Sequence, residues 1–370
     1  MIYKETLFFV AKCLTINHEE HNKRIVEEML QSNTVDWDEV VKLSTAHFVF
    51  PALYCNLKRA SLLSYLPEDL VEYMKYITEL NRERNEKIIT QAKELNTLLL
   101  EHKITPIFIK GTGNLLEGLY EDIAERMVGD IDVLIHKNDI KTAYELLNKN
   151  NCNKSTNYIS MHRHLPRIIN FKKISALEIH TELILKKYIK EFNYDFIKDD
   201  IQKINEVSVL SFENQLSLSI IASQINDYGF EHKSITLRNA YDVFLLSKKT
   251  FAKNAFKKLN TLQHPLNCFL AICFEVFNKP RSLEYFSSNQ TNQYLILFYK
   301  FLNDRKLWES NKDNYKKILR RNTRKNIIIY RFALIYKSLF YYRYRSHLLN
   351  KITDKNWRKE KLIRLGLRKP

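Results

Sequence analysis

Two aspartates on one apolar strand place the strongest limit on how this chain can fold. Residues 130–135 read Asp-Ile-Asp-Val-Leu-Ile, so acidic and aliphatic side chains alternate at the start of the segment. Because successive side chains of a strand point to opposite faces, Asp130 and Asp132 share one face and the aliphatic residues share the other. Two buried carboxylates repel each other and lose hydration unless a cation lies close to them. The strand therefore predicts a site for a metal ion.

Two further segments can complete this site. Upstream, the apolar run 107–109 predicts a short strand that ends at Lys110, and Gly111-Thr112-Gly113 then opens a segment of helical spacing. A glycine turn at the start of a helix can receive phosphate oxygens. Downstream, Glu178 alternates with apolar neighbours in a second predicted strand, with His180 on the same face. This strand can bring a third carboxylate to the metal.

Carboxylates beside a phosphate-binding turn predict phosphoryl or nucleotidyl transfer. Magnesium prefers a few carboxylate oxygens together with substrate phosphates, and paired metal ions can activate an attacking oxygen while they stabilise the leaving one. A pair of acids alone is a weak signal, because any surface strand can carry two acids on its wet face. The glycine turn, Arg126 and the later acid, in this order along the chain, favour the metal site.

At these residues the chain resembles the nucleotidyltransferases of the DNA polymerase beta superfamily. Their pattern is a Gly-Ser at a helix start, an Asp-x-Asp strand and a third acid on a later strand. Here Gly111-Thr112 stands where Gly-Ser is usual, and about eighteen positions separate it from Asp130, a longer loop than in the simplest members. More narrowly, a bacterial family of largely uncharacterised nucleotidyltransferases is similar at these motifs: Lys110-Gly111, Tyr120, Arg126, Gly129-Asp130-Ile131-Asp132 and Glu178-Ile179-His180.

The resemblance implies an enzyme that moves a nucleoside monophosphate from a nucleoside triphosphate to an acceptor hydroxyl and releases pyrophosphate. Its catalytic residues and metal ligands would be Asp130, Asp132 and Glu178, with Mg²⁺, or alternatively Mn²⁺, as the cofactor. The nucleotide-binding residues would be Lys110, Gly111, Thr112, Arg126, Gly129 and His180. For Lys110 and Arg126 the alternative is an ordinary salt bridge, and for His180 a structural hydrogen bond. The acceptor stays open between a small molecule, a protein and an RNA.

The predicted fold class is α+β, with a small mixed-sheet nucleotidyltransferase core and helical N-terminal and C-terminal domains. Only six glycines and seven prolines in 370 residues argue for long helices and few loops. We expect a helical region at 1–103, the core at 104–205, a helical bundle at 206–304 and a basic, aromatic-rich helical tail at 305–370. In the bundle, Arg238 and Asp242 are spaced to pair across one helical turn.

Positive charge is concentrated in the tail. The whole chain carries a formal net charge of +17, and residues 305–370 hold 21 lysines and arginines against four acids, so the rest of the chain is balanced. Apolar residues recur there at helical spacing, and Arg331, Lys337, Arg343 and Arg345 lie among aromatic residues. Such a helix can bind an RNA backbone or an anionic membrane, or it can pack on the bundle with its cations solvated.

The composition leads us to expect a cytoplasmic protein. No run of about 18 uncharged apolar residues exists, and the five cysteines are odd in number and scattered, as expected of reduced thiols in a cytoplasmic protein.

Two alternatives to an enzyme stay open. One is a non-catalytic nucleotide- or nucleic-acid-binding module on the same fold, and the other is a peripheral membrane protein led by its basic helix. His162 and His164 can contact a nucleotide or acceptor, or lie on a solvated edge.

Overall fold

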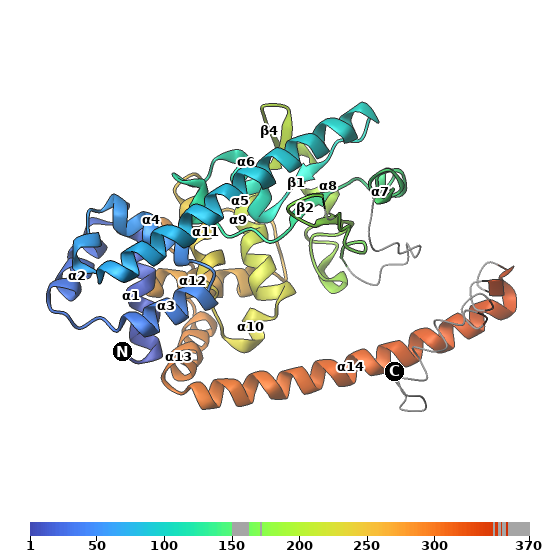
Figure 1. The fold of residues 1–370 in the computed structure, drawn as a ribbon. Helices are drawn as coiled ribbons and strands as arrows, with labels where there is room; N and C mark the ends of the chain where they lie inside the picture. Colours follow the sequence, from blue (N-terminus) through green and yellow to red (C-terminus); the bar gives the residue numbers. More distant parts are fainter. Residues whose placement is uncertain (150–162, 171, 343–344, 347–348, 350–352, 354–370) are drawn as a thin grey trace. The chain divides into compact units, whose positions relative to one another are not determined.

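The computed structural model describes residues 1–149, 163–170, 172–342, 345–346, 349 and 353. Within the last helix, the side chains of residues 323–331, 333–335 and 337 lie outside this description. The chain divides into two compact units, residues 1–305 and 306–370. The first unit holds a five-stranded mixed sheet flanked by helices (Figure 1), so the predicted α+β class is confirmed.

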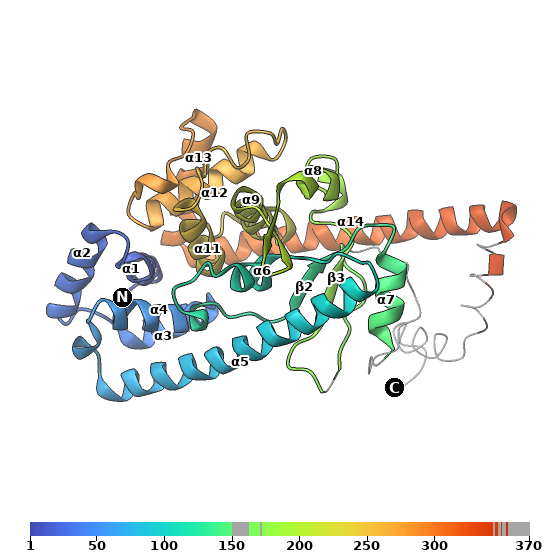
Figure 2. The same cartoon turned by 90° about the horizontal axis from the view of Figure 1, so that it is seen from above.

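Helices fill the chain before the sheet. Their bounds are α1 (Tyr3–Thr15), α2 (Glu20–Gln31), α3 (Trp37–Ala46), α4 (Phe50–Arg59) and α5 (Glu68–Glu101). The long helix α5 follows Pro67 and carries Glu68 and Asp69 in its first turn, where acidic side chains stabilise a helix start. Figure 2 shows α5 running from the N-terminal helices toward the sheet, and this one helix contacts both α4 and α6.

The sheet places the two acid-bearing strands side by side. Its order is β3-β2-β1-β5-β4, with β1 (Ile107–Phe108), β2 (Ile131–Leu134), β3 (Leu177–His180), β4 (Ile201–Ile204) and β5 (Val207–Leu210). Strands β2 and β3 are parallel, and their register sets Asp132 opposite Glu178. Strand β1 runs antiparallel to β2 and parallel to β5. The acids predicted from two separate stretches of sequence therefore lie on neighbouring strands.

Further helices surround this sheet and continue into a bundle. Their bounds are α6 (Lys110–Glu117), α7 (Ile140–Asn148), α8 (Tyr194–Ile197), α9 (Phe212–Ile221), α10 (Gly229–His232), α11 (Leu237–Ser247), α12 (Gln263–Val276) and α13 (Asn289–Asn303). Helix α11 buries Leu237, Ala240, Tyr241, Phe244 and Leu245, the residues whose spacing predicted its apolar face. One apolar core, from α1 to α13, joins these helices to the sheet.

The second unit consists largely of α14 (Arg305–Phe340), a helix of 36 residues that begins at the last residue of the first unit. Exposed aromatic and apolar side chains lie along its C-terminal half and just beyond it: Phe332, Tyr336, Leu339, Phe340, Tyr341 and Tyr342. Within the described residues, we find no helix with both the length and the apolarity that crossing a membrane requires.

Candidate active site

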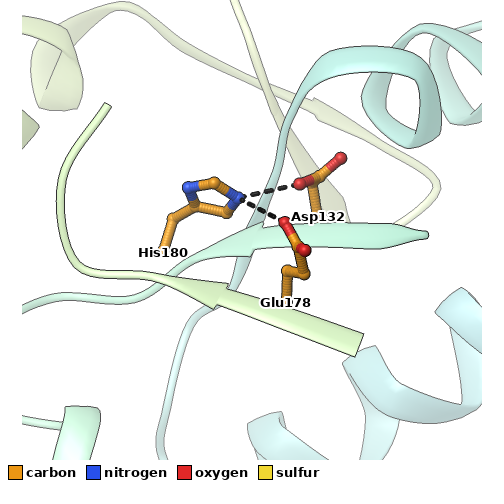
Figure 3. Close-up of side chains that lie close together, drawn as sticks. All are labelled: Asp132, Glu178 and His180. Atoms are coloured by element: carbon orange, nitrogen blue, oxygen red, sulfur yellow. Dashed lines mark hydrogen bonds and ion pairs between the residues drawn. The ribbon is translucent and has the colours of Figure 1, made fainter. Parts of the chain in front are cut away.

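Carboxylates and one imidazole gather on a single face of β2 and β3. Figure 3 shows Asp132, Glu178 and His180 converging, with Nε2 of His180 2.8 Å from Oδ1 of Asp132 and 3.6 Å from Oε2 of Glu178. All three residues are buried, and one ligand atom from each lies within 4.8 Å of the others. Asp130 precedes β2 and contributes a more exposed carboxylate beside them. Carboxylate oxygens and an imidazole nitrogen form a donor set that fits a divalent metal ion.

Nε2 of His180 has two neighbours at hydrogen-bond distance. With a proton on Nε2 the ring donates to Oδ1 of Asp132 at 2.8 Å, and with a lone pair there it accepts from the ammonium of Lys110 at 3.2 Å. The opposite nitrogen, Nδ1, is buried and has no hydrogen-bond partner among the described residues. His180 thus lies beside Asp132 through Nε2 alone, where it can orient this carboxylate, a positioning role that suits a metal site.

Lys110 contacts the acid face, the side of β2 and β3 on which Asp130, Asp132 and Glu178 lie. Its ammonium lies 2.7 Å from Oδ1 of Asp132 and 3.2 Å from Nε2 of His180. The residue begins α6 with a φ of 56°, in the left-handed region that costs a residue with a side chain about 1–2 kcal/mol. Strained backbone of this kind concentrates at functional sites. The sequence predicted Lys110 at a strand end, and the structure places it at the helix start immediately after.

Arg167 also contacts the acid face, and the sequence analysis did not single it out. One guanidinium nitrogen bridges Oδ2 of Asp130 at 2.8 Å and Oε1 of Glu178 at 2.7 Å, and Nε donates to the same Glu178 oxygen at 2.9 Å. Arg167 precedes Ile168, whose antiparallel bridge to Leu177 brings this segment alongside β3. The signal available in the sequence was a single basic residue within an apolar run that precedes the strand of Glu178.

The three carboxyl groups differ in acidity. Burial raises the pKa of Asp132, but Lys110 and His180 outweigh this effect and leave the pKa below its ordinary value. The pKa of Glu178 is lowered through the long contact with His180 and the hydrogen bonds from Arg167. For Asp130, burial dominates and raises the pKa, although Arg167 opposes it. Asp130 is thus the most basic of the three carboxylates.

The glycine turn is packed tightly against β1 and the segment that leads into β2. A Cβ on Gly113 would lie 2.7 Å from the backbone oxygen of Phe108, and one on Gly111 would lie 3.1 Å from the side chain of Val128. The hydroxyl of Thr112 is buried and donates to the backbone oxygen of Asp130 at 3.1 Å. The turn is therefore fixed to the residue that begins the acid face. The first N–H groups of α6 face no earlier turn of helix, as at any helix start.

Arg126 lies behind the turn, away from the acid face. Its guanidinium forms a buried ion pair with Asp242 of α11, with nitrogen–oxygen distances of 3.0 and 3.1 Å. Tyr120 donates to the other oxygen of Asp242 at 2.8 Å. Asp242 is thus bonded to residues outside its own helix, and among the ion pairs of the described chain none joins it to Arg238. Arg238 instead lies over the ring of Phe48, 4.9 Å from its centroid.

The other predicted residues fall in different places. The backbone oxygen of Gly129 accepts hydrogen bonds from Arg84 and from the hydroxyl of Ser175. Gly129 therefore holds these two side chains through its main chain. The ring of His164 lies 5.5 Å from that of His180, whereas His162 is outside the described residues. Half-buried Arg163, which the sequence did not single out, interacts electrostatically with Asp227, Glu178 and Asp132.

Of the four basic residues predicted for the tail, one is described in full. The guanidinium of Arg345 donates to the backbone oxygens of Ser338 and Leu339. Arg343 lies outside the described residues, and the side chains of Arg331 and Lys337 do too. The tail residues belong to the second compact unit.

Comparison with known proteins returned one match. The sequence model of a family described as "uncharacterised nucleotidyltransferase" matches residues 33–278, which include the acid face, the glycine turn and α11. No significant match was found among curated proteins or among solved structures. The matched region ends before α13 and the basic tail.

Proposed function

We propose, from the premise that this chain belongs to the family of uncharacterised nucleotidyltransferases, that it transfers a nucleotidyl group from a nucleoside triphosphate to an acceptor hydroxyl. We further propose that it is a bacterial member of the DNA polymerase beta superfamily, with a reaction that releases pyrophosphate. The observation that carries the proposal is the pairing of Asp132 with Glu178 on neighbouring strands, with Asp130 bridged to Glu178 by Arg167, beside the packed glycine turn of α6.

The chemistry of the donor set supports a metal-dependent reaction. Asp132 and Glu178 would hold Mg²⁺, or Mn²⁺ in its place, with Asp130 as a further oxygen ligand and His180 orienting Asp132. Oxygen donors suit both of these hard cations. A bound divalent ion of this kind neutralises phosphate charge and lowers the pKa of an attacking oxygen.

The residues of the chain would divide the remaining work. The glycine turn and the start of α6 would receive the triphosphate, and Lys110 would neutralise part of its charge. A carboxylate of the acid face, such as Asp130, would take the proton of the acceptor hydroxyl. The acceptor oxygen would then bond to the α-phosphorus as the bond to pyrophosphate breaks. Positioning and charge neutralisation would supply most of the rate.

The test offers each of the four α-labelled ribonucleoside triphosphates with Mg²⁺, in parallel with total RNA, cell protein and a small-molecule extract. Label should enter one acceptor pool with release of pyrophosphate, and Asp132→Asn should abolish the transfer. A matched control is Asp199→Asn, because Asp199 is an exposed acid just before β4, at the opposite edge of the sheet from β3. Nucleotide binding without transfer into any pool would favour the alternative, a non-catalytic nucleotide- or nucleic-acid-binding module on the same fold.

A second proposal concerns α14, which we expect to dock on an anionic membrane surface. Exposed apolar side chains such as Phe332, Leu339 and Phe340 stand in a tail with 21 basic and four acidic residues. Cationic helices with an apolar face lie in the headgroup region of anionic bilayers. RNA would use the charge and the aromatic rings, yet it gives exposed leucine no partner. A second copy of the tail would bring like charges together.

Vesicle sedimentation tests this docking. The full chain should pellet with vesicles that contain phosphatidylserine and stay in solution with neutral vesicles. Leu339→Glu with Phe340→Glu should weaken the binding, whereas Phe251→Glu, a change at an exposed apolar residue of the first unit, should not. Retention of total RNA on filters, without vesicle binding, would replace lipid by RNA as the partner. We also place the protein in the cytoplasm, where the buried free thiols of Cys13, Cys55, Cys268 and Cys273 would stay reduced.

A further inference from the structure

The acid face is partly neutralised by two side chains of the chain itself. Arg167 bridges Asp130 and Glu178, and Lys110 contacts Asp132. The face therefore carries three carboxylates against two cations. Each carboxylate that would ligate a divalent ion already has an oxygen bonded to an ammonium or a guanidinium.

Arg167 and Lys110 differ in how far they can move away. The side chain of Arg167 is half exposed, at 50%, whereas that of Lys110 is 27% exposed. Arg167 comes from a segment joined to β3 through isolated bridges at His164 and Ile168, outside the regular strands of the sheet. Its long side chain reaches the face from the solvent side. Arg167 is thus the cation that can leave the acids without disturbing the sheet.

An arginine in this position meets two opposing demands. Its positive charge stabilises the free carboxylates, but it repels a divalent ion and competes for the same oxygen lone pairs. A guanidinium also binds phosphate oxygens with two parallel hydrogen bonds, better than it binds a carboxylate that is shared with a metal. Both demands are met if the guanidinium changes partners.

We propose that Arg167 is an exchangeable counter-ion, which neutralises Asp130 and Glu178 in the free protein and moves to the nucleotide phosphates when these acids ligate a divalent ion. This inference rests on the proposed function. It makes Arg167 a phosphate ligand in addition to Lys110. It also makes the binding of metal and triphosphate cooperative. The metal takes the carboxylate partners of Arg167 and so frees the guanidinium for phosphate, and the phosphates draw the guanidinium away from the carboxylates that the metal needs.

The cooperativity gives opposite predictions for the metal alone and for the metal with phosphate. Arg167→Gln removes the competing charge, so the affinity for Mn²⁺ alone should rise, by at least about fivefold on the usual scale of coupling between sites. The same variant should lose most of the gain in Mn²⁺ affinity that tripolyphosphate produces in the unmodified protein. If Arg167 only stabilised the local structure, Arg167→Gln would not both raise the affinity for Mn²⁺ alone and reduce the gain that tripolyphosphate produces.

The experiment measures free Mn²⁺ by electron paramagnetic resonance with the full chain, with and without inorganic tripolyphosphate, and a protein-free titration subtracts the Mn²⁺ that tripolyphosphate itself chelates. Tripolyphosphate presents the phosphates without a base, so the unknown nucleotide preference does not matter. Lys173→Gln is the matched control, because Lys173 lies six positions further along and pairs with Glu94 away from the acid face. Arg167→Lys, which keeps the charge, should restore part of the tripolyphosphate effect. Circular dichroism checks that each variant is folded.

The outcomes separate this inference from the proposed function. Binding of Mn²⁺ that is lost in Asp132→Asn supports the metal site whatever Arg167 does. An unchanged or lower affinity for Mn²⁺ alone in Arg167→Gln, with that binding intact, overturns the counter-ion role and leaves the enzyme proposal standing. If neither the unmodified protein nor Arg167→Gln binds Mn²⁺ in either condition, the metal site and the counter-ion role fall together.

Discussion

The buried ion pair between Arg126 and Asp242 gives the sharpest prediction about stability. The side chains are 8% and 2% exposed, and Asp242 accepts from Tyr120 as well as from the guanidinium. Asp242→Asn keeps the shape of the side chain but removes its charge and points an amide toward the guanidinium. A buried charge that loses its partner typically costs 3–5 kcal/mol. We therefore expect the free energy of unfolding to fall by about 3–5 kcal/mol.

Urea denaturation of the full chain, followed by circular dichroism, measures this fall. Asp199→Asn changes an exposed acid in the same way and should alter the free energy of unfolding by less than about 0.5 kcal/mol. Replacing both partners, Arg126→Met with Asp242→Leu, should recover part of the loss because the guanidinium of Arg126 is then no longer buried without its carboxylate. A fall below about 1 kcal/mol in Asp242→Asn would show that water or rearrangement reaches the guanidinium, and the reasoning would fail.

Two further predictions concern pH and packing. Burial lowers the pKa of His47 to about 4, and its Nδ1 accepts from the N–H of Leu237, so the unfolded chain takes up a proton first. The free energy of unfolding should fall by up to about 3 kcal/mol between about pH 6.5 and 4 and then level off, a slope that denaturation of His47→Gln should lack. Gly113→Ala should lower the melting temperature, because its Cβ would meet the backbone oxygen of Phe108 at 2.7 Å. Gly129→Ala meets nothing within 4 Å, and an equal loss there would contradict the packing argument.

The alternation of acids and apolar residues was enough to predict the acid face. Side-chain direction follows from strand periodicity alone, so Asp130 and Asp132, and likewise Glu178 and His180, had to share faces. Their mutual approach depends on the register of β2 with β3, which sets Asp132 opposite Glu178. The family resemblance supplied this pairing where periodicity could not.

Arg126 and Asp242 show where sequence reasoning reaches its limit. Closeness in the chain favoured an ion pair between Arg238 and Asp242 across one helical turn, with Arg126 near the acids. The structure joins Arg126 to Asp242 across 116 positions, because both side chains lie in the space between the turn and α11. Such a contact depends on how helices pack on the sheet. No local periodicity contains that information.

The same limit applies to larger features. The short helix α10 begins after Tyr228, whose φ of 59° redirects the chain, and no periodicity of the sequence indicates this break. The boundaries at 103/104 and 205/206 stay predictions. The basic tail was visible from charge alone, but its partner depends on surfaces that charge does not specify.

The pair between Arg126 and Asp242 also has a mechanical consequence. A Cβ on Gly111 would lie 3.4 Å from the guanidinium carbon of Arg126, so this ion pair fills the space between the glycine turn and α11. Close packing of this kind transmits displacement. We therefore expect the turn and α11 to move together. If the first unit closes over a substrate, we expect the hinge to lie in other segments.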